Sequence, residues 1–361
     1  MHKTTNYLFS ADLLRAFAII LVVIIHVFSE YVNSPGYFLS GSWWIANFIN
    51  SMSRIAVPLF VMLSGMLILH DKKAYTIRVF LKKRISRIGL PLLIWPLLYF
   101  LWRLWLNHKE FTLESVINDY LSLGIYYHLY YLYIIAGLYL LTPLFKTFMN
   151  AATKETARYV VIVIFIFSLS ISLMKFFAHI GPNFATIFTV FLPYIPYYLA
   201  GDFLRDVRLS KRQAWLASSA FILLSALTTL GTYWHMGSVG WGVGDGRYRF
   251  DRYFYDYLSI TVIPMAILGY LLIQTLSDTT VILKKKLPSL VIGQLATTSF
   301  GIFLIHPFLL EFSNRILKLD FSEFHIPVIL FLLLKTILII STSYLITTLC
   351  RRLPVVKIIF G

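Results

Sequence analysis

The 361-residue sequence has little of what a soluble enzyme normally contains. Only 13% of its residues are charged, against about a quarter in ordinary globular domains, and 58% are hydrophobic. Its single cysteine, Cys350, excludes an intramolecular disulfide and argues against a thiol-based mechanism. We find no internal repeat, low-complexity tract or glycine-rich phosphate loop. The scarcity of charge and the high hydrophobic content exclude an ordinary soluble domain.

The apolar residues are concentrated in ten stretches of roughly twenty residues, the length at which a helix crosses a hydrocarbon layer of about 30 Å. Short polar segments separate the stretches and leave no room for a fused soluble domain. The stretches are 11–30, 45–69, 88–106, 126–148, 157–178, 184–204, 214–235, 255–276, 295–314 and 326–348. We therefore predict an all-α polytopic membrane protein, in which residues 1–361 form a single transmembrane domain of about ten transmembrane helices.

The net charge of +16 reflects 32 Lys and Arg residues against 16 Asp and Glu residues. Most of these cations lie in alternate connecting segments, which is the pattern of membrane-protein loops that face the cytoplasm. The basic excess therefore reports topology within a lipid bilayer, and we expect no nucleic-acid partner. The same pattern predicts that both termini are cytoplasmic and that the number of spans is even.

Ionisable residues occur inside the first predicted span, where each costs about 2.5–3.5 kcal/mol on insertion scales. Asp12 and Arg15 are three residues apart, so they share a helix face and can pair. Arg15 and His26 lie on one stripe of the helix, separated by about 16 Å along its axis. This arrangement favours a functional polar stripe, but it also fits an arginine that reaches the interface and a histidine that only packs.

Arg54 is the charged residue of the second span, four residues before Pro58. Because Pro58 has no N–H to donate to the carbonyl of residue 54, we expect a kink that leaves this carbonyl beside the guanidinium. Gly65 lies beyond the kink and permits close helix contact. We expect Arg54 near the depth of His26, which favours a functional or buried polar role.

Two further histidines lie in predicted spans. His128 belongs to a tyrosine-rich segment at the outer start of the fourth span, and His306 precedes Pro307 in the ninth. An interfacial aromatic belt explains the tyrosines, and a lone helical histidine is commonly a hydrogen-bonded core residue. With His26 and Arg54, however, they place three histidines and an arginine at similar depth. No cluster has metal-ligand spacing, so we expect no metal site.

A cluster of cations precedes the apolar part of the third span. Part of this cluster is the topology signal. Arg84 and Arg87 nevertheless lie one helical turn apart, a spacing that suits two guanidinium groups on phosphate, and Lys83 adds a third cation. Together with Arg15, these residues predict a cytoplasmic anion site.

These segments together resemble the membrane acyltransferase-3 family, in order and over essentially the whole chain. The segments that carry the resemblance are Arg15 with His26, Val57-Pro58-Leu59-Phe60 with Ser64-Gly65, Arg84 to Pro91, Tyr127-His128-Leu129, and Gly301 to His306. Within the family, Trp44-Ile45-Ala46-Asn47 leading into Ser53-Arg54, with Tyr127-His128-Leu129, is most similar to the O-acetyltransferases of enterobacterial common antigen.

The resemblance implies transfer of an acyl group, usually acetyl, from acyl-CoA to a sugar hydroxyl, with His26 as the catalytic residue and Arg15 as its partner. The donor substrate would be acetyl-CoA or another cytoplasmic acyl-CoA, and we expect no permanently bound cofactor. The acceptor would be an envelope glycan or a lipid-linked sugar. This implies a multi-pass protein of the bacterial cytoplasmic (inner) membrane.

Under this hypothesis Arg15, Arg84, Arg87 and Lys83 hold the CoA phosphates, and His26 acts as general base or transient nucleophile. The tetrahedral oxyanion, or the sugar, would be held by Arg54, His128 or His306. The main alternative is an exporter or flippase of a polysaccharide or lipid-linked sugar, lined by the same residues. A third interpretation is a non-catalytic assembly protein. No sequence feature specifies the oligomeric state.

Overall fold

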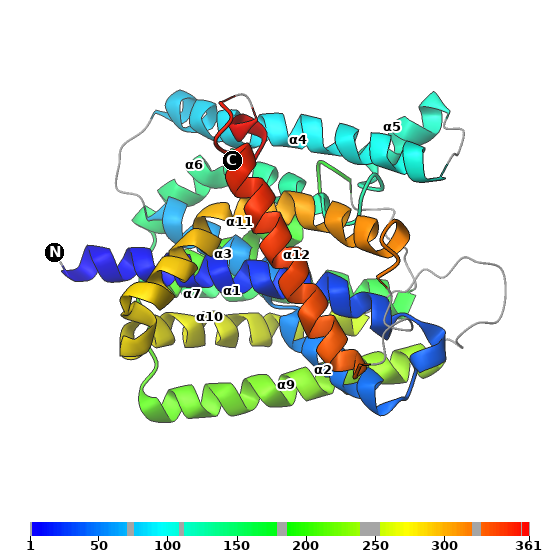
Figure 1. Cartoon of the computed structure of the whole chain (residues 1–361). Helices are drawn as coiled ribbons and strands as arrows, with labels where there is room; N and C mark the ends of the chain where they lie inside the picture. The colour runs from blue at the N-terminus through cyan, green and yellow to red at the C-terminus, as the bar shows by residue number, and fades with distance from the viewer. Residues whose placement is uncertain are drawn as a thin grey trace. The chain divides into compact units, whose positions relative to one another are not determined.

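The computed structural model describes residues 2–70, 76–107, 112–178, 186–238, 253–319, 326–354 and 356–360 (Figure 1). It divides into two compact units. The first unit contains Met1–Phe60, Leu169–His179 and Leu204–Tyr344, and the second contains Val61–Ser168, Ile180–Phe203 and Leu345–Gly361. The expectation that residues 1–361 form one membrane domain stays a prediction.

Helices make up all the regular structure in the described residues, which confirms the predicted all-α fold. The α-helices are α1 (His2–Val32), α2 (Gly41–Ser53), α3 (Ala56–Leu69), α4 (Ile77–Asn107), α5 (Leu113–Leu121), α6 (Tyr130–Ala151), α7 (Lys154–Ala178), α8 (Ile195–Phe203), α9 (Lys211–Ser238), α10 (Val262–Thr279), α11 (Lys286–Arg315), α12 (Val328–Cys350) and α13 (Lys357–Phe360). Short 3₁₀ helices are η1 (Pro35–Tyr37), η3 (Leu192–Tyr194), η4 (Tyr253–Tyr255) and η5 (Val281–Lys284).

Nine helical segments within the described ranges are long and apolar enough to cross a membrane. They are Phe9–Val32, Gly41–Leu69, Ile77–Leu106, Tyr130–Ala151, Lys154–Met174, Lys211–Gly237, Val262–Thr279, Lys286–Arg315 and Val328–Cys350. Each matches one of the apolar stretches in the sequence. The cytoplasmic placement of both termini stays a prediction.

The stretch 184–204 differs from its expected form. From residue 186 onward it forms a turn, then η3, then the nine-residue helix α8, so it contains no helix of membrane length. Pro193 and Pro196 account for the interruption, because a proline lacks the N–H of a helical hydrogen bond and disfavours helical geometry in the residue before it. Hydropathy reports how apolar this stretch is, but not whether it forms one continuous helix.

In the first unit, α1 packs against α2, α10 and α11, and α9 lies beside α2 and α10 (Figure 1). The α1–α2 connection is fixed at both ends. Ser40 caps α2 by accepting a hydrogen bond from the N–H of Trp43, and the Trp43 indole N–H donates to the terminal carbonyl of Val32 at 3.1 Å. This connection holds α2 against the C-terminal half of α1, where His26 lies.

The break between α2 and α3 falls at the position that Pro58 predicted. Helix α2 ends at Ser53, Arg54 is its C-cap, and α3 begins at Ala56. Because Pro58 cannot donate to the carbonyl of Arg54, the helix is interrupted one turn before the proline. The interruption places Arg54 at a helix end, next to α1.

In the second unit, α3 and α8 approach so closely that only glycine fits at their contact. A Cβ atom on Gly65 would lie 1.8 Å from the carbonyl oxygen of Tyr198, and one on Gly201 would lie 1.8 Å from that of Met62. Both obstructing atoms are backbone atoms, which cannot move aside as a side chain can. This confirms the close helix contact predicted for Gly65.

Candidate functional site

His26 and His306 form an imidazole pair in the first unit. Their ring centroids are 5.2 Å apart, with His26 on α1 and His306 on α11. His306 is fully buried, and its Nδ1 lies 2.9 Å from the carbonyl oxygen of Ile302. Because a carbonyl only accepts, Nδ1 is the donor, and Nε2 carries the lone pair of the neutral ring. His26 is only partly buried, so it is the more exposed imidazole of the pair.

Arg54 lies beside the same part of α1. Its Nη2 donates to Asn50 Oδ1 at 2.6 Å and to Ser29 Oγ at 3.4 Å, and its guanidinium carbon lies 3.8 Å from the centre of the Tyr255 ring. Ser29 is three residues after His26, so the cation is held next to the turn of α1 that carries the histidine. The structure thus brings three sequence-predicted residues together: His26, Arg54 and His306.

Buried polar residues that we did not predict support Arg54. The Tyr255 hydroxyl donates to Asn47 Oδ1, and the Asn47 amide donates to the carbonyl of Thr229 at 3.3 Å. Asn50 donates to Ser29 Oγ at 2.8 Å, and Asn47 and Asn50 are both fully buried. Two asparagines three residues apart in an apolar helix were the available signal for this network.

A second polar group lies one turn beyond His26 on α1. Glu30 accepts hydrogen bonds from Lys335 Nζ at 3.1 Å and from Asn314 Nδ2, and Lys335 also donates to Asn314 Oδ1. These three residues, the Glu30 triad, join α1, α11 and α12. The charge of Lys335 in a span was visible in the sequence, but its partner lies about 300 positions away. Glu30, an acidic residue four positions after His26 in an apolar stretch, was the sequence signal for this partner that we missed.

Arg15 pairs with Asp12 as predicted, with Nη1 at 3.2 Å from Oδ1. The two side chains are about one-third exposed. Arg15 does not contact His26, because eleven residues of continuous helix separate them by about 16 Å. Any joint action of the two therefore needs a ligand of that length along α1.

The remaining predicted residues belong to the second unit. His128 lies in the turn before α6, not within a span, and packs 4.9 Å from Tyr99 and 5.6 Å from Tyr126 between ring centroids. It is almost fully buried. Lys83, Arg84 and Arg87 lie on the first turns of α4. This helix begins at Ile77, eleven residues before the apolar stretch that starts at residue 88. Lys83 and Arg87 are exposed there, and Arg84 is partly buried.

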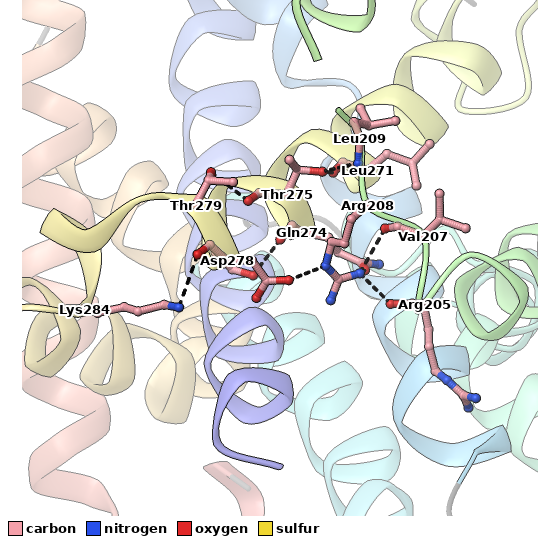
Figure 2. Close-up of polar contacts among 11 residues, drawn as sticks. Arg205, Val207, Arg208, Leu209, Leu271, Gln274, Thr275, Asp278, Thr279 and Lys284 are labelled. Atoms are coloured by element: carbon pink, nitrogen blue, oxygen red, sulfur yellow. Dashed lines mark hydrogen bonds and ion pairs between the residues drawn. The ribbon is translucent and has the colours of Figure 1, made fainter. Parts of the chain in front are cut away.

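Arg208 forms a separate polar cluster before α9, which Figure 2 shows in detail. Its guanidinium donates to Asp278, to Gln274 and to the carbonyls of Arg205 and Val207. Because protein acceptors take these donors, the cluster ties the turn before α9 to the end of α10. It does not present a site for an outside anion.

The histidine pair and Arg54 provide the groups that acyl transfer needs. A neutral imidazole can accept the proton of a hydroxyl nucleophile, and a fixed cation nearby can stabilise an oxyanion. Within the described part of the chain, no group of three or more His, Cys, Asp or Glu side chains is placed to hold a metal ion. The chemistry open to these residues is acid–base and electrostatic.

Comparison with protein families gives a match that spans nearly the whole chain. Residues 8–348 match the model described as an acyltransferase domain, acyltransferase family 3. Neither the comparison with curated proteins nor that with solved structures gives a match. The match includes α1 from its first apolar turn, the whole histidine pair and nearly all of α12. With nine helices of membrane length among its described residues, the chain is a multi-pass membrane protein that belongs to the acyltransferase-3 family of membrane acyltransferases.

Proposed function

We propose that this protein is an O-acyltransferase that moves an acetyl group from cytoplasmic acetyl-CoA to a hydroxyl of an envelope glycan or lipid-linked sugar. Within the family, the enterobacterial-common-antigen type of O-acetyltransferase is the subtype whose segments it most resembles. The protein would work in the bacterial cytoplasmic (inner) membrane. Donor, acceptor and location are parts of this proposal.

One observation carries the proposal: a partly accessible imidazole, His26, pairs with a buried imidazole and lies one turn from a clamped guanidinium. A histidine that only packs would need neither the neighbouring histidine nor the cation. Charged and ionisable groups within membrane spans are costly, so their convergence around one accessible residue supports a catalytic role.

In the proposed reaction a ring nitrogen of His26 takes the proton from the acceptor hydroxyl. The hydroxyl oxygen attacks the thioester carbonyl carbon, and the resulting tetrahedral oxyanion is stabilised by Arg54. The C–S bond then breaks, the ester remains on the sugar, and the CoA thiolate receives the proton from His26. Two substrates thus give an acetylated sugar and free CoA, and no other reactant is needed.

The donor would be held away from the reacting atoms. Arg15 lies about 16 Å from His26 along α1, so a phosphate-binding group there requires an extended linker to bring a thioester to the histidine. The pantetheine arm of CoA is such a linker. Arg84, Arg87 and Lys83 are proposed to contribute to phosphate binding from the first turns of α4.

The proposal is tested with purified protein, labelled acetyl-CoA and candidate envelope glycans. A general base contributes about 10²–10⁴-fold, so His26→Ala should lower labelled transfer by at least about a hundredfold. His235→Ala is the matched control, because His235 lies on α9 of the same unit and has no proposed role. It should leave transfer within about twofold of wild type.

Both variants should elute as folded protein on gel filtration, which separates loss of chemistry from loss of structure. Near-wild-type transfer by His26→Ala would remove His26 from the mechanism. An exporter or an assembly protein would leave every glycan unlabelled even with the wild-type protein, and that outcome would refute the proposed function.

A further inference from the structure

The Glu30 triad has no part in the transfer step described above, yet it lies beside the reacting residues. Glu30 follows His26 by one turn on the same helix, about 6 Å further along the axis. Side chains at such spacing are neighbours on the helix surface. Whatever contacts the carboxylate of Glu30 is therefore within reach of His26.

A purely structural role explains the triad poorly. Lys335 is only 6% exposed and lies in a span, where an ionised side chain is costly. A buried ion pair rarely stabilises a protein more than apolar residues of similar size would. Helices α1, α11 and α12 could have been joined by apolar contacts alone.

The members of the triad are exposed to different extents, and this difference indicates which kind of ligand the triad can bind. The side chain of Lys335 is 5% exposed, whereas that of Glu30 is 32% exposed. The ammonium group therefore orients the carboxylate from its buried side, and the carboxylate is the face that a ligand meets. A carboxylate has about four lone-pair positions and accepts hydrogen bonds only. Such a face binds hydroxyl or N–H donors and repels anions.

We propose that the Glu30 triad is the acceptor subsite, in which Glu30 accepts hydrogen bonds from hydroxyls of an uncharged sugar residue. This inference rests on the proposed function. It deepens that function by naming the acceptor class: the acetylated residue is a neutral sugar, because an acidic sugar would bring its own carboxylate against Glu30. Lys335 and Asn314 are positioning residues that fix the carboxylate.

The test measures KM separately for acetyl-CoA and for the glycan that the wild-type protein acetylates. Glu30→Gln keeps the size of the side chain but removes its charge, so it weakens hydrogen bonds from sugar hydroxyls. We expect KM for the glycan to rise by about tenfold or more, because hydrogen bonds to charged groups are the stronger class. KM for acetyl-CoA should change by less than about twofold.

Glu311→Gln is the matched control. Glu311 pairs with Arg315 one turn along α11 at 3.0 Å, and Arg315 is largely exposed. The control makes the same chemical change at a pair outside the subsite, and it should leave both KM values unchanged. Lys335→Met should raise KM for the glycan in the same direction as Glu30→Gln.

If Glu30→Gln fails to fold because Lys335 is left uncompensated, the double variant Glu30→Gln with Lys335→Met decides the matter. It removes both charges together, which is far better tolerated than removal of one. The double variant should insert and fold, bind acetyl-CoA normally, and still show the raised KM for the glycan.

The outcomes separate the two proposals. Wild-type protein that acetylates no glycan would refute the proposed function and this inference with it. Active wild type with an unchanged glycan KM in the folded Glu30 variants would overturn the subsite alone. Mass spectrometric location of the acetyl group on an acidic sugar residue would also overturn it, whereas location on a neutral residue supports it.

Discussion

Arg54 offers the sharpest test of how the site stabilises charge. If its guanidinium stabilises the oxyanion, Arg54→Ala should lower kcat by about 10²–10³-fold, the usual effect of losing one such donor. Arg54→Lys keeps the charge but loses the planar group that stacks on Tyr255 and bonds Asn50. We expect the lysine variant to recover only part of the lost rate.

Two contacts of known typical strength hold this guanidinium in place. Its short charge-assisted bond to Asn50 contributes about 1.5–3 kcal/mol, and its stacking on Tyr255 at 3.8 Å contributes about 0.5–2 kcal/mol. Their sum, about 2–5 kcal/mol, matches or exceeds the approximately 2 kcal/mol of rotamer entropy that an arginine side chain loses when fixed. Arg54 is therefore preorganised before substrate binds. Tyr255→Leu should lower kcat by up to about tenfold without affecting acetyl-CoA binding.

The assay is turnover of labelled acetyl-CoA at saturating glycan, with Arg315→Ala as the control for loss of a cation on the exposed end of α11. The control should match wild type. A folded Arg54→Ala protein with kcat within about twofold of wild type would show that Arg54 does not act on the transition state.

Three further changes test the fold and the donor site. Gly65→Ala should prevent stable folding, because its Cβ would meet a backbone carbonyl at 1.8 Å, whereas Gly293→Ala meets nothing within 4 Å and should be tolerated in a thermal unfolding assay. Arg84→Ala with Arg87→Ala should raise the Kd for acetyl-CoA by about tenfold, measured by calorimetry. If these residues hold phosphate, the increase in Kd should be smaller for 3′-dephospho acetyl-CoA. Equal increases for both ligands would contradict that role. Asp278→Asn, which removes the ion pair of Figure 2 whose side chains are about one-third exposed, should lower the free energy of unfolding by less than about 1 kcal/mol and leave transfer unchanged.

Much of the helical architecture could be predicted from the sequence, because hydropathy and proline act locally. The length of the apolar stretches predicted ten helices of membrane length, of which the described residues form nine, and Pro58 predicted the interruption at Arg54. Helix periodicity likewise predicted the pairing of Asp12 with Arg15, which the structure confirms. Each of these inferences needs only residues within a few turns of one another.

The site was predictable only in part, because its contacts join distant segments. The charge of Lys335 indicated that a partner exists, but nothing local indicates that the partner is Glu30 on α1. Tyr255 lies in a short 3₁₀ helix outside any clear pattern, so its position under Arg54 could not be foreseen. Their positions inside predicted spans singled out His26 and His306, and tertiary structure was needed to show that their rings meet.

Mass spectrometry of envelope glycans tests the proposed transfer most directly. Cells that produce the wild-type protein should carry an O-acetylated glycan that is missing from cells without the protein and from cells that produce His26→Ala at equal membrane abundance. The same acetylated glycan in all three, or in the His26→Ala cells at wild-type level, would contradict acyl transfer at the imidazole pair of α1 and α11.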